Sequence, residues 1–259
     1  MKNHMQHPQS NANSVRLNKA IAATGLCSRR KADQLIFAGR VTVNAVPERN
    51  PARQILPDDA LAVDGRNLSA PQAFIYLLLN KPTQVVCTVS DPDGRPTVMD
   101  CLPKNIRHQR VYPVGRLDYF SEGLLLLTND GQLAQRLMHP RYHLPKKYEV
   151  LVRDIVSAAA VQCMRQGMRL AEGDILQPVE VTVDTGGYRG NTLLRMVLHQ
   201  GVNRQIRRMC RDLGLTILRL RRVAQGPLSL GCLASGAVRP LSPAEIRQLR
   251  ICAGLHSPS

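Results

Sequence analysis

The sequence contains few aromatic residues: six Tyr, three Phe and no Trp among 259 residues. Proteins that bind unpaired RNA on a broad stacking platform need several exposed aromatic rings, so this composition disfavours that class. If the protein binds nucleic acid, we expect cationic side chains to carry most of the affinity.

The sequence also lacks close cysteine pairs and long apolar runs. Among seven cysteines the closest two, Cys87 and Cys101, are fourteen residues apart, which argues against a zinc ribbon or a disulfide framework and fits a reducing cytoplasm. The apolar run 124–127 is far shorter than the roughly 20 residues of a membrane helix. The polar residues 1–13 lack the apolar stretch of a signal peptide. We therefore expect a soluble cytoplasmic protein with no membrane partner.

Negative charge is scarce as well. Thirty-five Lys and Arg against 19 Asp and Glu give a net charge of +16. A surplus of this size favours polyanionic partners, because neutralising phosphates releases their condensed counterions.

The chain is expected to begin with a disordered tail over residues 1–13, which are rich in Asn, Gln, His and Ser. Apolar residues at helical spacing then predict helices over 17–24 and 28–39, the second capped by Ser28. Alternating residues predict short strands at 40–44 and 61–65. Together they predict a small helix, helix, strand, strand module over residues 14–70.

The remainder, residues 73–252, is predicted to be rich in strands, with helices that do not alternate regularly with them. Strands are expected at 75–79, 85–89, 111–114, 124–128, 148–152, 179–183 and 193–198. Helices are expected at 132–138, 157–166, 204–213 and 243–249. This order favours an α+β fold over a doubly wound parallel sheet.

Three cations stand at the start of the second predicted helix: Arg29, Arg30 and Lys31. The positive end of the helix dipole disfavours cations there, whereas a bound phosphate would use both the side chains and the free helix N–H groups. A solvated charge run and a phosphate site are both open interpretations of this feature.

The helix predicted at 204–213 has one apolar face and one basic face. The basic face contains Arg204, Arg207, Arg208 and Arg211. Surface helices usually mix charge signs, but Asp212 is the only acid between Arg204 and Arg222. We interpret the basic face as a nucleic-acid contact rather than a solvated stripe.

A third feature is the segment 115–118, which contains Arg116 and Asp118 two residues apart. In an extended chain both side chains point to the same side, and a nearby guanidinium favours the ionised acid that a carboxylate nucleophile requires. The spacing by itself fits a structural ion pair better than a catalytic site.

Three ordered motifs nevertheless resemble those of bacterial ribosomal RNA pseudouridine synthases, in the branch that contains the small-subunit enzyme and its large-subunit relatives. They are GRLDYFSEGLLLLTNDG at 115–131, KY at 147–148 and GVNRQIRRM at 201–209. Residues 14–72 resemble the S-four RNA-binding domain through RLNK at 16–19, SRRKA at 28–32 and GRVTVN at 39–44. The resemblance covers almost everything after residue 13.

The resemblance implies a cofactor-free isomerase that breaks the bond between N1 and C1′ of one uridine and rejoins the base through C5. Asp118 would be the essential carboxylate, which attacks the sugar or the base or removes a sugar proton. Tyr148 would stack on the flipped uracil, Arg207 would pair with Asp118, and Arg116 would support the site. The implied fold has a mixed, largely antiparallel sheet with a basic cleft across it.

RNA contacts would come from both predicted domains, through Arg29, Arg30, Lys31, Arg40, Arg204, Arg208 and Arg211. The loop 91–97 is most similar to the large-subunit relatives, so the expected partner is large-subunit ribosomal RNA or a ribosome-assembly intermediate. The resemblance also implies a monomer. We expect no metal site: His139 and His143 are four residues apart, but Pro140 argues against a shared helix face.

Two residues depart from the family pattern. Phe120 stands where a polar residue is usual in the catalytic loop, and Ala45 replaces a turn glycine. The alternative hypotheses are a non-catalytic RNA-binding or ribosome-assembly protein, which fits the charge and the small N-terminal module, and a DNA-binding regulator, which leaves residues 73–252 without a purpose.

Overall fold

The computed structural model describes residues 14–107, 109–142, 144–153, 155–184, 186 and 190–255. The chain divides into two units, Met1–Ala73 and Phe74–Ser259. The predicted tail over residues 1–13 lies outside the described residues. In the part of the chain that the structure describes, no helix combines the length and the apolar character needed to cross a bilayer.

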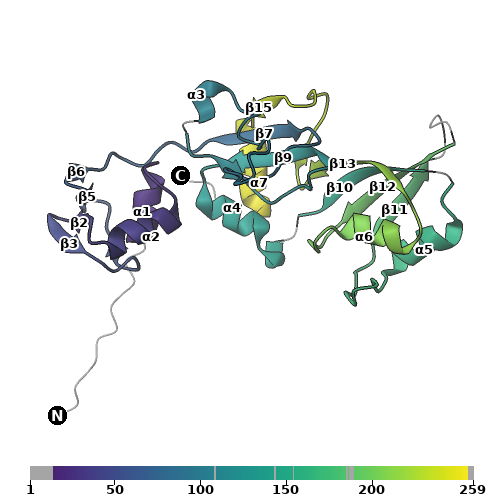
Figure 1. Ribbon diagram of the computed structural model, residues 1–259, viewed down its shortest axis with the longest axis horizontal. Helices are drawn as coiled ribbons and strands as arrows, with labels where there is room; N and C mark the ends of the chain where they lie inside the picture. The colour runs from purple at the N-terminus through teal and green to yellow at the C-terminus, as the bar shows by residue number, and fades with distance from the viewer. Residues whose placement is uncertain are drawn as a thin grey trace, which may run out of the picture. The chain divides into compact units, whose positions relative to one another are not determined.

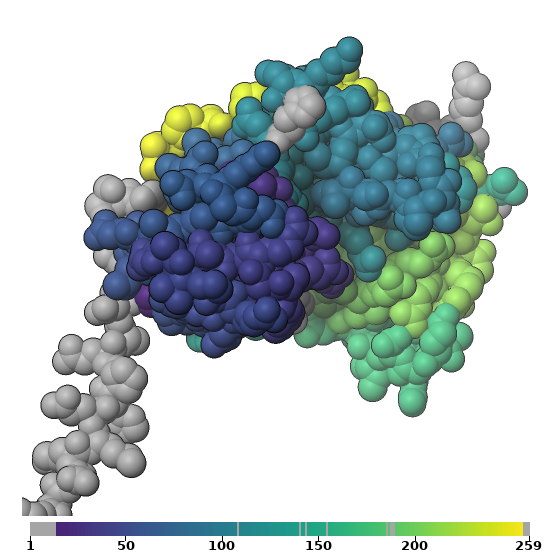
Figure 2. All heavy atoms as spheres, turned by 60° about the vertical axis from the view of Figure 1, so that its left-hand side comes forward, coloured from purple at the N-terminus to yellow at the C-terminus, as the bar shows by residue number. Residues whose placement is uncertain are grey.

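Over its described residues, 14–73, the N-terminal unit contains two helices and six short strands (Figure 1). Their bounds are β1 Val15–Arg16, α1 Leu17–Ala23, α2 Arg29–Phe37, β2 Val41–Val43, β3 Val46–Glu48, β4 Gln54–Ile55, β5 Leu61–Val63 and β6 Arg66–Asn67. Four of the strands form an antiparallel sheet in the order β3-β2-β5-β6, and β1 pairs with β4. The space-filling view shows the residues of this unit, in purple and blue, packed closely together (Figure 2).

Sequence signals explain the helices of this unit. Ser28 caps α2 as predicted, because its hydroxyl accepts a hydrogen bond from the N–H of Lys31 at 3.1 Å. Leu17, Ile21 and Ile36 are fully buried between the helices and strands. The amphipathic spacing seen in the sequence is therefore the core of this unit.

The departure at Ala45 lies in the turn between β2 and β3. Asn44 and Ala45 have φ angles of 51° and 65°, a region that favours glycine at the second position. The Asn44 side chain supports the turn, because its Nδ2 donates to Asp59 and its Oδ1 accepts from the N–H of Ala60 at 2.9 Å. The turn therefore forms without the glycine.

The C-terminal unit contains one nine-stranded sheet and five α-helices within the described residues (Figure 1). The strands are β7 Tyr76–Lys81, β8 Tyr112–Pro113, β9 Glu122–Thr128, β10 Lys146–Val152, β11 Glu180–Asp184, β12 Thr192–Leu198, β13 Ile217–Gln225, β14 Leu228–Ser229 and β15 Val238–Pro240. The helices are α3 Lys104–Arg107, α4 Gly131–Met138, α5 Ala158–Gln166, α6 Gln205–Asp212 and α7 Pro243–Cys252, with a short 3-10 turn at Pro140–Tyr142.

The sheet order is β11-β12-β10-β13-β9-β7-β15. All its pairs are antiparallel except β13 with β9, which are parallel. The α+β class and the mixed, largely antiparallel sheet are therefore confirmed.

The leucine run of β9 is buried on both faces of the sheet. Leu124 and Leu126 pack in the cluster that includes α4 and α7, whereas Leu125 and Leu127 pack on the opposite face. A strand covered on both sides needs apolar residues at every position, which is why this segment shows no alternation. On the neighbouring half of the sheet, α5 and α6 pack over β10 to β13 (Figure 1).

The two halves of the sheet join where β13 runs beside the start of β9. Gly123 lies opposite Arg222, and a side chain at Gly123 would place a Cβ 2.2 Å from the Arg222 carbonyl oxygen. Because Gly123 has no side chain, β9 and β13 can pair at this position. The position lies directly after the segment that carries Asp118.

Strand β13 was not predicted from the sequence, because its three arginines hide the apolar alternation that predicts strands. The strand expected at 85–89 was wrong, since this segment makes only an isolated bridge between Val86 and Thr97. The Thr88 hydroxyl donates to the Ser90 carbonyl and turns the chain there.

The contacts of Glu245 at the start of α7 predict that the stability of the protein depends on pH. Ser242 and Glu245 form a capping box, and Arg239 donates two hydrogen bonds of 2.8 and 2.6 Å to the Glu245 carboxylate. These contacts, the Arg239 bonds first, lower the pKa of Glu245 from 4.5 to about 2.

A depressed pKa means that the folded state binds the Glu245 proton less tightly than the unfolded state. The stabilisation is therefore complete above about pH 4.5 and is lost as the pH falls through about 2. We expect the difference in unfolding free energy between the wild type and Glu245→Gln to fall by roughly half between pH 7 and pH 3. Urea denaturation at both pH values measures it, and a constant difference contradicts the assignment.

Candidate active site

Asp118 lies in a four-residue turn that leads into β9. The N–H of Ser121 donates to the Asp118 carbonyl at 3.0 Å, which closes the turn. Just before it, the N–H of Leu117 donates to the Cys87 sulfur at 3.3 Å. The backbone of the turn is thus fixed internally, and the residue before it is fixed against Cys87, so that Asp118 has a defined backbone position.

The partner of Asp118 is Arg207 of α6. Its Nε lies 3.1 Å from Asp118 Oδ2, and its Nη2 donates to the Phe120 carbonyl and to the Ser121 hydroxyl, both at 2.9 Å. The Arg207 and Asp118 side chains are 19% and 29% exposed. The structure therefore contains the ion pair that the family resemblance implied, and it connects the two halves of the sheet.

The ion pair expected between Arg116 and Asp118 from their spacing was wrong. Arg116 is exposed and makes no ion pair with any residue that the structure describes. The chain turns at Gly115, whose φ is +79°, and again at 118–121, so the segment is not extended. Alternation of side chains along an extended chain does not apply there.

Lys81 also binds this turn, through the Ser121 carbonyl, and was not predicted as a site residue from the sequence. Its side chain is fully buried at the end of β7, where Nζ donates to the carbonyls of Pro82 and Ser121 at 2.7 and 2.8 Å. Burial lowers the pKa of Lys81, and nearby groups that include Asp118 oppose this shift. A lysine at the end of an otherwise apolar strand was the available sequence signal.

Removing this lysine should destabilise the protein. Lys81→Met leaves one buried and one partly buried carbonyl without their donor, for which we expect a loss of about 3 kcal/mol in unfolding free energy. The exposed Lys104→Met serves as the matched control, with an expected change within about 0.5 kcal/mol. Urea denaturation compares them, and equal stabilities would show that the Lys81 contacts contribute nothing.

Tyr148 lies on β10, half-buried, on the face of the sheet that packs against α6. In the sheet it lies opposite Arg222, which in turn lies opposite Gly123. Tyr148 is thus two strands from the start of β9, or about 10 Å between backbones. Arg222 is buried between them, and its Nε donates to the Leu124 carbonyl at 2.8 Å.

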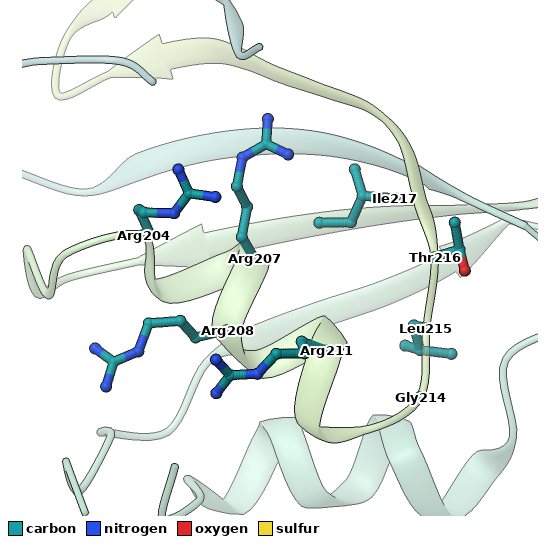
Figure 3. Close-up of a pocket in the computed structure, with 8 residues that line it drawn as sticks. All are labelled: Arg204, Arg207, Arg208, Arg211, Gly214, Leu215, Thr216 and Ile217. Atoms are coloured by element: carbon teal, nitrogen blue, oxygen red, sulfur yellow. The ribbon is translucent and has the colours of Figure 1, made fainter. Parts of the chain in front are cut away.

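Four arginines of α6 and its N-cap line an open groove of about 480 Å³ with the residues 214–217 (Figure 3). They are Arg204, Arg207, Arg208 and Arg211. Figure 3 shows Arg207 pointing away from Arg208 and Arg211. The predicted basic helix therefore borders a groove whose lining includes Arg207, the partner of Asp118.

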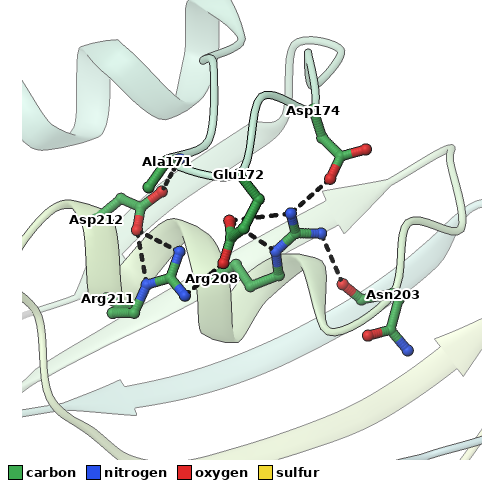
Figure 4. A network of polar contacts seen from close by, with 7 residues as sticks. All are labelled: Ala171, Glu172, Asp174, Asn203, Arg208, Arg211 and Asp212. Atoms are coloured by element: carbon green, nitrogen blue, oxygen red, sulfur yellow. Dashed lines mark hydrogen bonds and ion pairs between the residues drawn. The ribbon is translucent and has the colours of Figure 1, made fainter.

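The expectation of a uniformly basic face was wrong for two of the four arginines. Glu172 lies between Arg208 and Arg211 and accepts hydrogen bonds from both (Figure 4). Asp174 also pairs with Arg208, and Asp212 pairs with Arg211. Glu172 has its pKa lowered to about 2, by Arg211 first and then by Arg208. Glu172 and Asp174 lie about 35 residues before α6 in the sequence. The spacing of residues within α6 therefore could not predict that they pair with its arginines.

The other cations expected to bind RNA belong to the N-terminal unit. Arg29, Arg30 and Lys31 are exposed in the first turn of α2 and make no ion pair with the described residues. Arg40 differs from them, because its Nε donates to Asp64 at 2.7 Å. This contact raises the pKa of Arg40, and any phosphate at Arg40 competes with Asp64.

Of the two histidines considered for a metal, only His139 is described. Its Nδ1 accepts a hydrogen bond from the N–H of Arg141 at 3.1 Å, which is a loop contact. His143 lies outside the described residues.

With this geometry in place, comparisons with known proteins define the class. The family model of RNA pseudouridylate synthases matches residues 75–212, and the model of the S4 (S-four) domain matches residues 15–61. The chain belongs to the RNA pseudouridylate synthase family and carries an N-terminal S4 domain.

Individual relatives agree with the family. An uncharacterised RNA pseudouridine synthase of Aquifex aeolicus is 42% identical over 93% of this chain and 96% of its own length. The ribosomal large subunit pseudouridine synthase B of Bacillus subtilis is 37% identical over 92% and 96%. A crystal structure of a pseudouridylate synthase superposes with a TM-score of 0.64 at 28% identity, covering 91% of this chain and all of that one. The placement in the branch with the small-subunit enzyme stays a prediction.

Proposed function

We propose that this protein converts one uridine of large-subunit ribosomal RNA to pseudouridine, with Asp118 as the essential carboxylate and no cofactor. The observation that carries the proposal is the ion pair between Asp118, which lies in a fixed turn, and Arg207, which also lines an arginine-rich groove. The named Bacillus subtilis relative supports the choice of large-subunit RNA.

The reaction is an isomerisation, so its atoms balance without a co-reactant. The N1 to C1′ bond breaks, the base turns, C5 bonds to C1′, and the proton lost from C5 is matched by one gained at N1. A base in folded RNA must first leave its stack, which costs a few kcal/mol. In this proposal Tyr148 stacks on the flipped uracil, and Arg116 contributes from the exposed side of the turn.

Phosphate contacts then offset part of the flipping cost. We assign them to Arg204, Arg208 and Arg211 along the groove and to the exposed cations of α2 and Arg40. In this assignment residues 14–70 form the RNA-binding domain and residues 73–252 the catalytic domain. Because Arg208 and Arg211 are paired with acids, Arg204 and the α2 cations should contribute most to the salt dependence of binding.

The test incubates the protein with unmodified large-subunit and small-subunit ribosomal RNA and with the corresponding pre-ribosomal particles. Pseudouridine is then mapped by carbodiimide-stop primer extension. One new stop in large-subunit RNA supports the proposal and identifies the target. A stop in small-subunit RNA contradicts the choice of substrate, and tight binding without any stop favours a non-catalytic RNA-binding protein.

A further inference from the structure

The turn that carries Asp118 also presents an exposed aromatic ring. Phe120 is 63% exposed, and the exposed part of a large apolar side chain does not contribute to folding through burial. It occupies the third position of the turn Asp118–Ser121, two residues after the carboxylate. The structure therefore places a free aromatic face at the edge of the proposed active site.

The backbone of the turn that carries this ring is constrained by hydrogen bonds. Each of the four carbonyls of residues 118–121 accepts a hydrogen bond, in order from Ser121 N–H, Gln84 N–H, Arg207 Nη2 and Lys81 Nζ, at 2.7 to 3.0 Å. The Phe120 ring also packs edge-on against the Tyr119 ring, with centroids 4.9 Å apart and an interplanar angle of 80°. An aromatic side chain held in this way loses little conformational entropy when a flat ligand covers it.

The other two phenylalanines are equally exposed but lie in different settings. Phe37 is the last residue of α2, and Phe74 precedes β7. Neither stands in the Asp118 turn. Exposure alone thus does not distinguish Phe120; its constrained backbone and its position beside Asp118 do.

We propose that Phe120 stacks on the RNA base next to the target uridine and occupies the space that this uridine leaves when it flips out. The inference rests on the proposed function. A flipped base leaves its neighbour without a stacking partner, and apolar side chains can occupy such gaps between bases. A Phe ring suits this role, since it stacks on any base. A single ring of this kind is compatible with a chain too poor in aromatics for a broad platform.

The inference predicts that Phe120 matters most when flipping is costly. Two hairpins are built around the uridine that the wild type modifies, one with the uridine base-paired and one with it unpaired and mismatched. Replacing Phe120 by Ala should slow the single-turnover reaction about 10-fold on the paired hairpin and less than about 3-fold on the unpaired one, where flipping costs little. Phe120→Trp should keep the wild-type rates, and Phe120→Leu should lie between Trp and Ala.

A fluorescent base gives a second readout, which would not change if Phe120 had only a structural role in the protein. With 2-aminopurine beside the target uridine, the Phe120→Ala complex should be brighter than the wild-type complex, because the probe lacks a stacking partner. Phe74→Ala, which removes an equally exposed ring elsewhere, is the matched control and should match the wild type in rates and fluorescence.

The outcomes separate this inference from the proposed function. Wild-type protein that forms no pseudouridine overturns both. If the wild type is active but Phe120→Ala keeps the wild-type rate on both hairpins, the stacking role alone is overturned. The same holds if the variant is slowed by the same factor on both hairpins. An unchanged fluorescence of the Phe120→Ala complex overturns it as well.

Discussion

Replacing Asp118 by Asn or Ala is expected to abolish pseudouridine formation while RNA affinity stays within about 3-fold of the wild type. Removing an essential nucleophile or base typically lowers the rate by at least about 10⁴-fold. The Asp118→Asn variant keeps the shape of the side chain and loses only the negative charge. Affinity should survive, because the charge removed has the same sign as the RNA backbone.

Single-turnover assays with carbodiimide mapping measure the rate, and filter binding at fixed salt measures the affinity. Glu122→Gln is the matched control, since Glu122 is a carboxylate four residues further along, whose nearest cation is Arg219 at 3.9 Å. It should retain activity within about 3-fold. An Asp118→Asn variant that retains more than about 1% of the wild-type rate contradicts the assignment of the essential carboxylate.

Replacing Arg207 by Ala should lower the single-turnover rate by about 10²-fold at saturating RNA. Truncating one partner of a buried ion pair costs about 3–5 kcal/mol, and partial exposure of both partners reduces this cost. The same side chain also holds the Phe120 carbonyl and the Ser121 hydroxyl. Arg207→Ala therefore frees the carboxylate and loosens the turn together.

Two further variants separate these roles. Arg207→Lys keeps the charge but cannot reproduce the three contacts of the guanidinium, so we expect a rate between those of the wild type and the Ala variant. Arg208→Ala removes the next arginine of α6, which pairs with Glu172 and Asp174. It should weaken binding without changing the rate at saturation. Equal rate losses for Arg207→Ala and Arg208→Ala would show that α6 acts only through general charge.

Much of the fold followed from local patterns. The Ser28 cap, the amphipathic helices and the apolar run of β9 are properties of residues close together in the chain, and the structure has them where expected. The wrong or missing predictions concern segments whose structure depends on pairing with residues far away in the sequence. Strand β13 carries three arginines, and its formation depends on pairing with β10 and β9 rather than on its own alternation.

Some features of the candidate site were also predicted from the sequence, and others were not. The motifs singled out Asp118, Tyr148 and Arg207, and the basic spacing of α6 singled out its arginines. The motifs gave no indication that Lys81 supports the catalytic turn, and the spacing gave none that Glu172 neutralises part of the basic face. Both contacts join residues more than thirty positions apart.

The sequence by itself therefore determined the chemistry available to this protein: a cationic chain with one candidate carboxylate in a recognisable motif. Residue spacing favoured Arg116 as the partner of that carboxylate and the motif resemblance implied Arg207; the tertiary structure decided between them. Arg116 is two residues away and exposed, whereas Arg207 is 89 residues away and in contact. The reason is physical: two turns rotate the nearer guanidinium out of reach, and packing of α6 on the sheet brings the distant one to within 3.1 Å.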